Sequence, residues 1–213
     1  MNNGVTFGSK NSIVDWDLLM VSKSIGEAEP ITNYIEIPGR DGALDLSESL
    51  GEIKYKNRTL SFEFDLFNPI SFYTTQREIT NYLDGRKLKI TLDQDPNYYF
   101  YGRCRVNSSS ITKNLGHFTV ECICEPYRYK QSITTISNSV STGNSYNYIN
   151  DRKSVVPTLT LSSAMTLEFK GNTYSLNSGS QKVLDIEFKE GTNTIKVING
   201  SGTLSVSYQE ASL

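Results

Sequence analysis

This chain of 213 residues lacks a large excess of either charge. It has 21 lysines and arginines and 23 aspartates and glutamates. The net charge at neutral pH is −2. A protein that holds nucleic acid usually presents a concentrated basic face. The balance therefore argues against a nucleic-acid-binding protein.

Long apolar runs are also missing. No stretch approaches the roughly 20 apolar residues of a membrane-spanning helix, so no membrane contact is predicted. Residues 1–10 lack the basic region and apolar core of a secretory signal. We therefore expect synthesis and retention in a cytoplasm, where cysteines stay reduced.

Histidine and cysteine are scarce, which argues against catalysis and metal binding. His117 is the single histidine, and no nucleophile motif lies near it. The cysteines, Cys104, Cys122 and Cys124, alternate with apolar residues on predicted strands, which is typical of small core residues. A disulfide from Cys104 is geometrically conceivable but disfavoured in a reducing compartment. His117 has the opposite parity from Cys122 and Cys124, so a fourth zinc ligand is missing. The sequence predicts no enzyme and no cofactor.

The residues before Lys130 have the pattern of a sheet with one helix. Residues 59–67 alternate as a half-buried strand does. Asn68 and Pro69 suit a helix start and Gly85 suits a helix end, so a helix is predicted over 70–84. Its buried side would hold Phe72, Ile79 and Leu83. Further strands are expected over 88–92, 98–106 and 116–124, with a polar loop at 107–114.

The segment I-E-I-P-G-R-D-G-A-L-D-L at 35–46 predicts a strand, a tight turn and a second strand. Its proline removes a backbone donor, and its two glycines permit positive φ. Arg40 and Asp41 are therefore expected at an exposed loop tip. Residues 34–37 alternate as a half-buried strand would.

This segment, with the motifs that follow it, resembles the N-terminal domain of the distal tail proteins of long-tailed, non-contractile bacteriophages. The resemblance covers about residues 13–128 and continues through N-R at 57–58, G-R-K-L-K-I-T-L-D at 85–93, Y-Y-F-Y-G-R at 98–103 and E-P-Y-R at 125–128. It implies a structural virion protein at the phage tail tip, short for its family and synthesised in the cytoplasm of the bacterial host.

The resemblance also implies partners. The protein would form a ring, a homohexamer, between the tail tube protein and the tail-associated hub protein. DNA would only pass through its lumen. A receptor-binding protein would attach further out.

The second half has a different composition. Ser, Thr and Asn dominate residues 132–151, which predicts a linker. Short strands with glycine turns follow, which is typical of a small antiparallel sandwich. They are expected over 155–161, 166–169, 173–176, 183–188, 194–198 and 203–208. The predicted fold is mainly β: an α+β ring domain at 1–130 and an antiparallel β-sandwich at 131–213, which the resemblance implies is galectin-like or carbohydrate-module-like.

Two pairs of residues are candidates for the contact between subunits. Arg40 offers a planar fork and Asp41 a complementary acceptor, so they suit an ion pair between neighbours; the alternative is a solvated turn. Tyr99 and Tyr101 lie on a strand with aromatic rings on both faces, and tyrosine is favoured at interfaces. The alternative there is a strand buried on both sides.

A carbohydrate-binding adhesin is the alternative function. Its sandwich would recognise a host cell-wall saccharide directly, through an exposed aromatic platform or an acidic groove. The tyrosines that would stack on sugar rings are Tyr146, Tyr148, Tyr174 and Tyr208, although this half contains no tryptophan.

Overall fold

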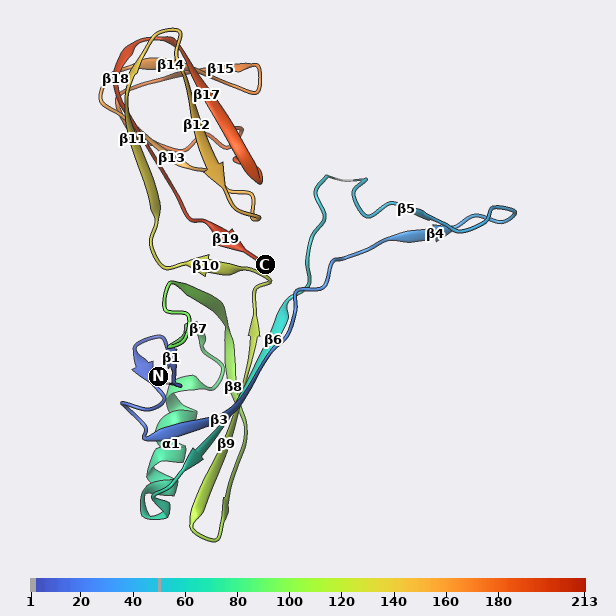
Figure 1. Ribbon diagram of the computed structural model, residues 1–213, viewed down its shortest axis with the longest axis vertical. Coiled ribbons are helices and arrows are strands. Elements are labelled where there is room, and N and C mark those ends of the chain that lie inside the picture. Colours follow the sequence, from blue (N-terminus) through green and yellow to red (C-terminus); the bar gives the residue numbers. More distant parts are fainter. Residues whose placement is uncertain (1–2, 50) are drawn as a thin grey trace. The chain divides into compact units, whose positions relative to one another are not determined.

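The computed structural model describes residues 3–49 and 51–213, and the chain divides into two compact units (Figure 1). The first unit runs to Arg128 and includes the last residue, Leu213; the second holds residues 129–212. Regular structure is almost all strand, and α1 (Phe72–Leu83) is the α-helix of the described residues. The predicted mainly β fold with one helix is confirmed.

The first unit is built on an antiparallel sheet with the strand order β2-β1-β7-β8-β9-β6-β3. These strands are β1 (Val5–Phe7), β2 (Lys10–Asn11), β3 (Leu18–Ile25), β6 (Arg58–Leu66), β7 (Lys87–Leu92), β8 (Tyr98–Thr112) and β9 (Leu115–Cys124). Every second residue of β6 is buried, because side chains alternate between the faces of a strand. One face is therefore core and the other faces outward.

Helix α1 shares the core of this sheet. Its buried side chains are the predicted ones, Phe72, Ile79 and Leu83. The helix begins later than predicted because residues 69–71 form a 3₁₀ turn, η1 (Pro69–Ser71). Asn68 accepts from the backbone N–H of Ile70 at 3.2 Å and therefore caps this turn rather than α1. Gly85 follows the end with φ of 74°, as predicted.

The three cysteines are core residues, as predicted. Cys104, Cys122 and Cys124 are free thiols with no exposed surface. The Sγ atoms of Cys122 and Cys104 lie 3.2 Å apart. This contact and burial together raise the pKa of Cys122, and burial raises the pKa of Cys124 to about 12. The side chain of His117 points away from this core, on the outer face of β9, and its Nδ1 lies 2.6 Å from Oδ1 of Asp65.

Two predictions for the first unit are wrong. Residues 107–112 are not a loop, because β8 continues to Thr112 and pairs with β9 through a turn at Lys113. Residues 34–37 are exposed rather than half-buried. They belong to a separate two-stranded sheet of β4 (Tyr34–Glu36) and β5 (Ala43–Asp45).

The second unit is a sandwich of two four-stranded sheets. One has the order β11-β18-β13-β16 and the other β12-β17-β14-β15. The strands are β11 (Thr134–Ser141), β12 (Ser145–Asn150), β13 (Thr158–Leu161), β14 (Met165–Phe169), β15 (Asn172–Leu176), β16 (Gly179–Gln181), β17 (Gly191–Asn199) and β18 (Ser201–Tyr208). Apolar residues of both sheets form one core, including Leu159 and Val206 from the first and Leu167 and Val197 from the second. Two short strands, β10 (Arg128–Lys130) and β19 (Ala211–Ser212), pair with each other.

Two predictions for the second unit are also wrong. Residues 132–151 are not a linker, since they contain β11 and β12. Residues 183–188 do not form a strand; they contribute one bridge, from Phe188 to Val155. Ile186 and Phe188 nevertheless have no exposed surface, so the segment fills the core without pairing along its length.

Candidate assembly surfaces

The arm, defined as residues 26–57, joins β3 to β6 and has no buried residue among those described. Every residue from 31 to 43 is exposed. In the β4–β5 hairpin, Ile35 pairs with Leu44 and Tyr34 pairs with Asp45 (Figure 1). Partners in a pair lie on the same face, so the hairpin has an apolar face and a face with tyrosine and carboxylate. Exposed apolar side chains on both strands are typical of a contact surface.

The tip of the arm is the predicted turn. Gly39 and Gly42 have φ of 82° and 74°, a region that side chains with a Cβ rarely adopt. Arg40 and Asp41 lie between them and are exposed. The two side chains are therefore displayed at the far end of a hairpin.

Hydrogen bonds within the arm give it a defined shape. Asp45 accepts from the Ser47 backbone at 2.9 Å, and the backbone N–H of Asn33 donates to the Ser47 hydroxyl at 2.8 Å. The bonds from Ser47 lower the pKa of Asp45, which stays charged. Nearer the sheet, Lys56 and Glu29 form an ion pair at 3.1 Å.

The second surface is the basic strip, defined as Lys87, Lys89, Arg103 and Arg105 with Tyr99 and Tyr101, on the outward parity of β7 and β8. Lys87 lies over the Tyr101 ring at 4.5 Å and Lys89 over the Tyr99 ring at 4.3 Å. Such cation–π contacts hold the cations above the sheet. Tyr99 and Tyr101 are half-buried while Phe100 points into the core, so the strand is not buried on both sides.

Two shallow hollows flank the middle of the basic strip. Arg103 and Ile123 line both, with Glu121 in one and Glu125 in the other. Ile123 is 54% exposed although its strand neighbours are core cysteines. Glu125 pairs with Lys87 at 2.8 Å. The strip therefore combines cations, aromatic rings and one apolar side chain, which suits an acidic and apolar peptide segment.

The two predicted pairs do not form one site. Arg40 and Asp41 lie in the turn between β4 and β5, and Tyr99 and Tyr101 lie in β8 of the main sheet. Sequence reasoning missed the lysines and arginines beside the tyrosines. Their alternation over Lys87–Lys89 and Arg103–Arg105 is the signal that would have found them, because it places all four on one face.

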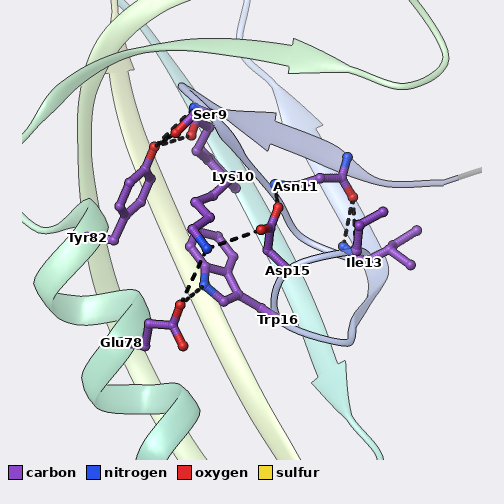
Figure 2. A network of polar contacts seen from close by, with 10 residues as sticks. Ser9, Lys10, Asn11, Ile13, Asp15, Trp16, Glu78 and Tyr82 are labelled. Atoms are coloured by element: carbon purple, nitrogen blue, oxygen red, sulfur yellow. Dashed lines mark hydrogen bonds and ion pairs between the residues drawn. The ribbon is translucent and has the colours of Figure 1, made fainter.

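A polar network that sequence reasoning also missed fixes the N-terminal segment to α1 (Figure 2). The buried indole of Trp16 donates to Glu78 at 3.3 Å. Lys10 lies 3.1 Å from Asp15 and 3.8 Å from Glu78. The Tyr82 hydroxyl accepts from a backbone N–H of the β1–β2 turn at 3.0 Å. These contacts are internal to the unit and fasten the N-terminal segment to α1; they do not form a site.

The sandwich does not present the tyrosine platform that sugar stacking needs. Tyr148 has no exposed surface and stacks on Phe188 at 5.6 Å, and Tyr208 is 3% exposed. Tyr146 and Tyr174 are packed against the same core. Of the four tyrosines that the adhesin alternative would use, Tyr148 and Tyr208 therefore lie in the core, because their side chains point inward. The outward parity of the β11-β18-β13-β16 sheet carries hydroxyl side chains: Thr135, Ser137, Ser139, Thr203, Ser205, Ser207, Thr158, Thr160 and Ser180.

Within residues 3–49 and 51–213, no group of three His, Cys, Asp or Glu side chains is arranged to hold a metal ion. No helix in that part of the chain is both long enough and apolar enough to cross a membrane.

Comparison with known proteins identifies the family. The model of the phage tail protein RIFT-related domain matches residues 18–124, half of the chain. The chain belongs to this family of phage tail proteins. Among solved structures, it is similar to the Dit protein (gp 19.1) of phage SPP1, described as a paradigm of the hub adsorption apparatus in phages that infect Gram-positive bacteria. The identity is 16%, the TM-score is 0.70, and the match covers 98% of this chain and 99% of the other. A search of curated protein sequences finds no match.

Proposed function

We propose that this phage tail protein is a structural component of the distal tip of a long, non-contractile tail, where it closes into a hexameric ring. The observation that carries the proposal is the fold, which matches a hub adsorption protein along nearly the whole of both chains. The family match to the first unit supports the same position in the virion.

The ring lies between the tail tube protein and the tail-associated hub protein. Its N-terminal units, residues 1–130, make the contacts between subunits. The galectin-like sandwich, residues 131–213, faces outward and carries receptor-binding proteins. DNA passes through the lumen, and a chain with a net charge of −2 gives it little to adhere to.

The mechanism is mechanical. One surface of each subunit binds a different surface of the next, and a contact of this head-to-tail kind closes into a ring when its rotation fits. The ring then adapts the symmetry of the tube to that of the tip. No step in this role requires a catalytic group or a cofactor, and assembly in the cytoplasm of the bacterial host needs no export.

Direct recognition of a saccharide by the sandwich is less well supported. Two of the four candidate tyrosines are in the core, and the other two pack against it. The large apolar side chains that the sandwich exposes are aliphatic, and none of them is an aromatic ring that could stack on a sugar.

The full-length chain tests the proposal. Native mass spectrometry up to about millimolar concentration should give a mass six times that of the 23.9 kDa chain. Gold-labelled antibody should mark the tail tip in electron micrographs of particles. Label on the capsid would contradict the proposed position, and an assembly of another size would contradict the hexamer. Monomers in solution alone would not, because ring closure can depend on the neighbouring tail protein.

A further inference from the structure

Two of the three buried cysteines face each other across neighbouring strands. Cys104 on β8 is paired directly with Cys122 on β9. Their Sγ atoms lie 3.2 Å apart, and neither side chain has exposed surface. A disulfide bond is about 2.0 Å long, so the two sulfurs would have to approach by only about 1.2 Å to form one.

The backbone around this pair has the geometry that a disulfide between strands needs. The N–H of Cys104 donates to the carbonyl oxygen of Arg86 at 2.9 Å, and the carbonyl oxygen of Cys104 accepts from the N–H of Gly85 at 3.0 Å. Both backbone groups therefore bond on the side away from β9, which makes Cys104 and Cys122 a non-hydrogen-bonded pair. The Cα atoms of such a pair lie about 4.5 Å apart, inside the range of about 4.4–6.8 Å that disulfides bridge.

The third cysteine has no partner of this kind. Cys124 faces Gly102 on β8, and its Sγ lies 3.7 Å from the carbonyl oxygen of Cys122 on its own strand. Cys104 and Cys124 are diagonal neighbours, and their Cα separation of about 7–8 Å is too long for a disulfide. The geometry therefore favours one pairing, between Cys104 and Cys122.

We infer that Cys104 and Cys122 close to a disulfide in the released virion, and that this bond joins β8 to β9 within the core of the main sheet. The inference rests on the proposed function, which takes the chain from a reducing cytoplasm into a particle outside the cell. In the cytoplasm both thiols stay reduced. Outside it the oxidant is dissolved oxygen: the two thiols lose two protons and two electrons, an S–S bond forms, and one oxygen molecule becomes hydrogen peroxide.

Burial makes this conversion slow and its reversal slower. The contact with the Cys104 sulfur and burial raise the pKa of Cys122, so few molecules hold the thiolate that begins oxidation. Oxidation therefore proceeds through local opening of the sheet. Once the disulfide has formed, the same core shields it from reductants.

The bond would stabilise the fold by restricting the unfolded chain. The two cysteines are 18 positions apart in the sequence. Closing a loop of that length shifts the folding equilibrium toward the folded state by about a hundredfold or more. By linkage, the folded protein holds the disulfide against reductant more strongly than the unfolded chain by the same factor.

A redox titration of the full-length protein tests the pairing. The chain is brought to equilibrium from both sides in mixtures of reduced and oxidised glutathione, quenched with acid, unfolded and alkylated with N-ethylmaleimide. Oxidised glutathione takes up the two electrons and leaves as two thiols. Intact mass then counts free cysteines: three adducts for the reduced chain and one for the chain with the disulfide. Trypsin should release residues 104–105 joined to residues 114–128.

The expected results are a shift in the titration and a shift in melting temperature. The disulfide should withstand an about hundredfold higher ratio of squared reduced to oxidised glutathione concentration in the folded protein than in urea. It should also raise Tm by about 5–10 °C. A disulfide that is no more stable in the folded chain than in the unfolded chain, or that lowers Tm, would overturn the inference and leave three core thiols.

Two matched variants locate the bond, because each removes one buried thiol. Cys124→Ala keeps the pair, so oxidation should take it from two adducts to none. Cys104→Ala removes the pair and should keep two adducts at every glutathione ratio. Equal behaviour of the two variants would overturn the assignment to Cys104 and Cys122.

Purified particles extend the test to the virion. The chain from cells sampled before lysis should take up three adducts after unfolding, and the chain from particles kept in aerated buffer should take up one. Three adducts in both samples would overturn the disulfide in the virion. A chain that is absent from the particles would instead contradict the proposed function, and with it the virion part of the inference, whatever the glutathione titration shows of the pair.

Discussion

The buried thiols should resist modification in the folded protein. Cys124 is completely buried, and burial raises its pKa to about 12. The thiolate is the form that reacts with an alkylating reagent. At pH 8 an ordinary thiol of pKa about 8.5 is about one quarter ionised, whereas one of pKa about 12 is ionised in about one molecule in ten thousand.

Ionisation alone therefore slows the reaction of Cys124 by about a thousandfold or more. Exclusion of the reagent slows it further, because all three cysteines have no exposed surface. Cys122 is protected for a second reason, since its Sγ contacts that of Cys104 at 3.2 Å. Labelling should thus proceed only through opening of the sheet.

The assay is intact-mass analysis of the chain during incubation with iodoacetamide at pH 8, with and without denaturing urea. The unfolded chain should take up three adducts, one per cysteine. The folded chain should take up none over the same time. An adduct that forms on the folded chain within about tenfold of the unfolded rate would refute the assignment of these cysteines to a closed core.

Two further changes test the core and the sandwich. Gly102→Ala would place a Cβ against Cys124 Sγ and 2.6 Å from the carbonyl oxygen of Ile123. Urea unfolding should therefore show a loss of about 1–3 kcal/mol that Ser24→Ala, at an exposed position of β3, does not cause. Unchanged stability would contradict the close strand contact. The pKa of Asp151 is raised, first by burial and then by the nearby charge of Glu210. Ionised Asp151 is therefore less favourable in the folded chain than in the unfolded chain. The folded state loses stability as the pH rises above the unfolded pKa of about 4. Asp151→Asn should therefore raise Tm at pH 7, with the gain vanishing below about pH 4, and the exposed change Asp185→Asn should not; an equal gain at both pH values would contradict the pKa shift.

Strong alternation made much of the first unit predictable. Leu60, Phe62, Phe64 and Leu66 are buried where period-two patterning puts them. The helix residues Phe72, Ile79 and Leu83 follow the helical period in the same way. Large apolar side chains supply most of the burial free energy in both cases, so the pattern and the fold agree.

The errors have a common physical origin. Residues 132–151 have the composition of a linker, because Ser, Thr and Asn dominate them and apolar residues such as Ile136 and Val140 are in the minority. In β11 the hydroxyls bond across the sheet instead, Thr135 to Ser207 at 3.0 Å and Ser137 to Ser205 at 2.9 Å. Composition alone does not distinguish such a strand from a loop.

The candidate assembly surfaces were predictable only in part. The sequence predicts the tip position of Arg40 and Asp41, because the tendency of the flanking glycines to adopt positive φ depends only on the local chain. The exposure of residues 34–37 was not predicted, because alternation of Tyr34 to Ile37 normally indicates a buried face. Alternation reports that a strand has two different faces. It does not report whether the apolar face is covered by the same chain or by another.

Arg58 lies at the boundary between the exposed arm and the buried strand β6. It is the first residue of β6 and directly follows the arm, yet it is only 3% exposed and packs over the Phe100 ring at 5.6 Å. Its Nε and Nη2 have no hydrogen-bond partner, and burial lowers its pKa, while Glu27 at the other end of the arm favours its charge. Burying a partly unpaired guanidinium costs folding free energy. The contact of Arg58 with the aromatic ring of Phe100 and the charge of Glu27 offset that cost only in part. The arm therefore returns to the sheet at a fixed point in the core, while the described residues between Glu27 and Asn57 all remain accessible. An uncovered hairpin with exposed apolar side chains, held at a buried base, is suited to contact with another molecule.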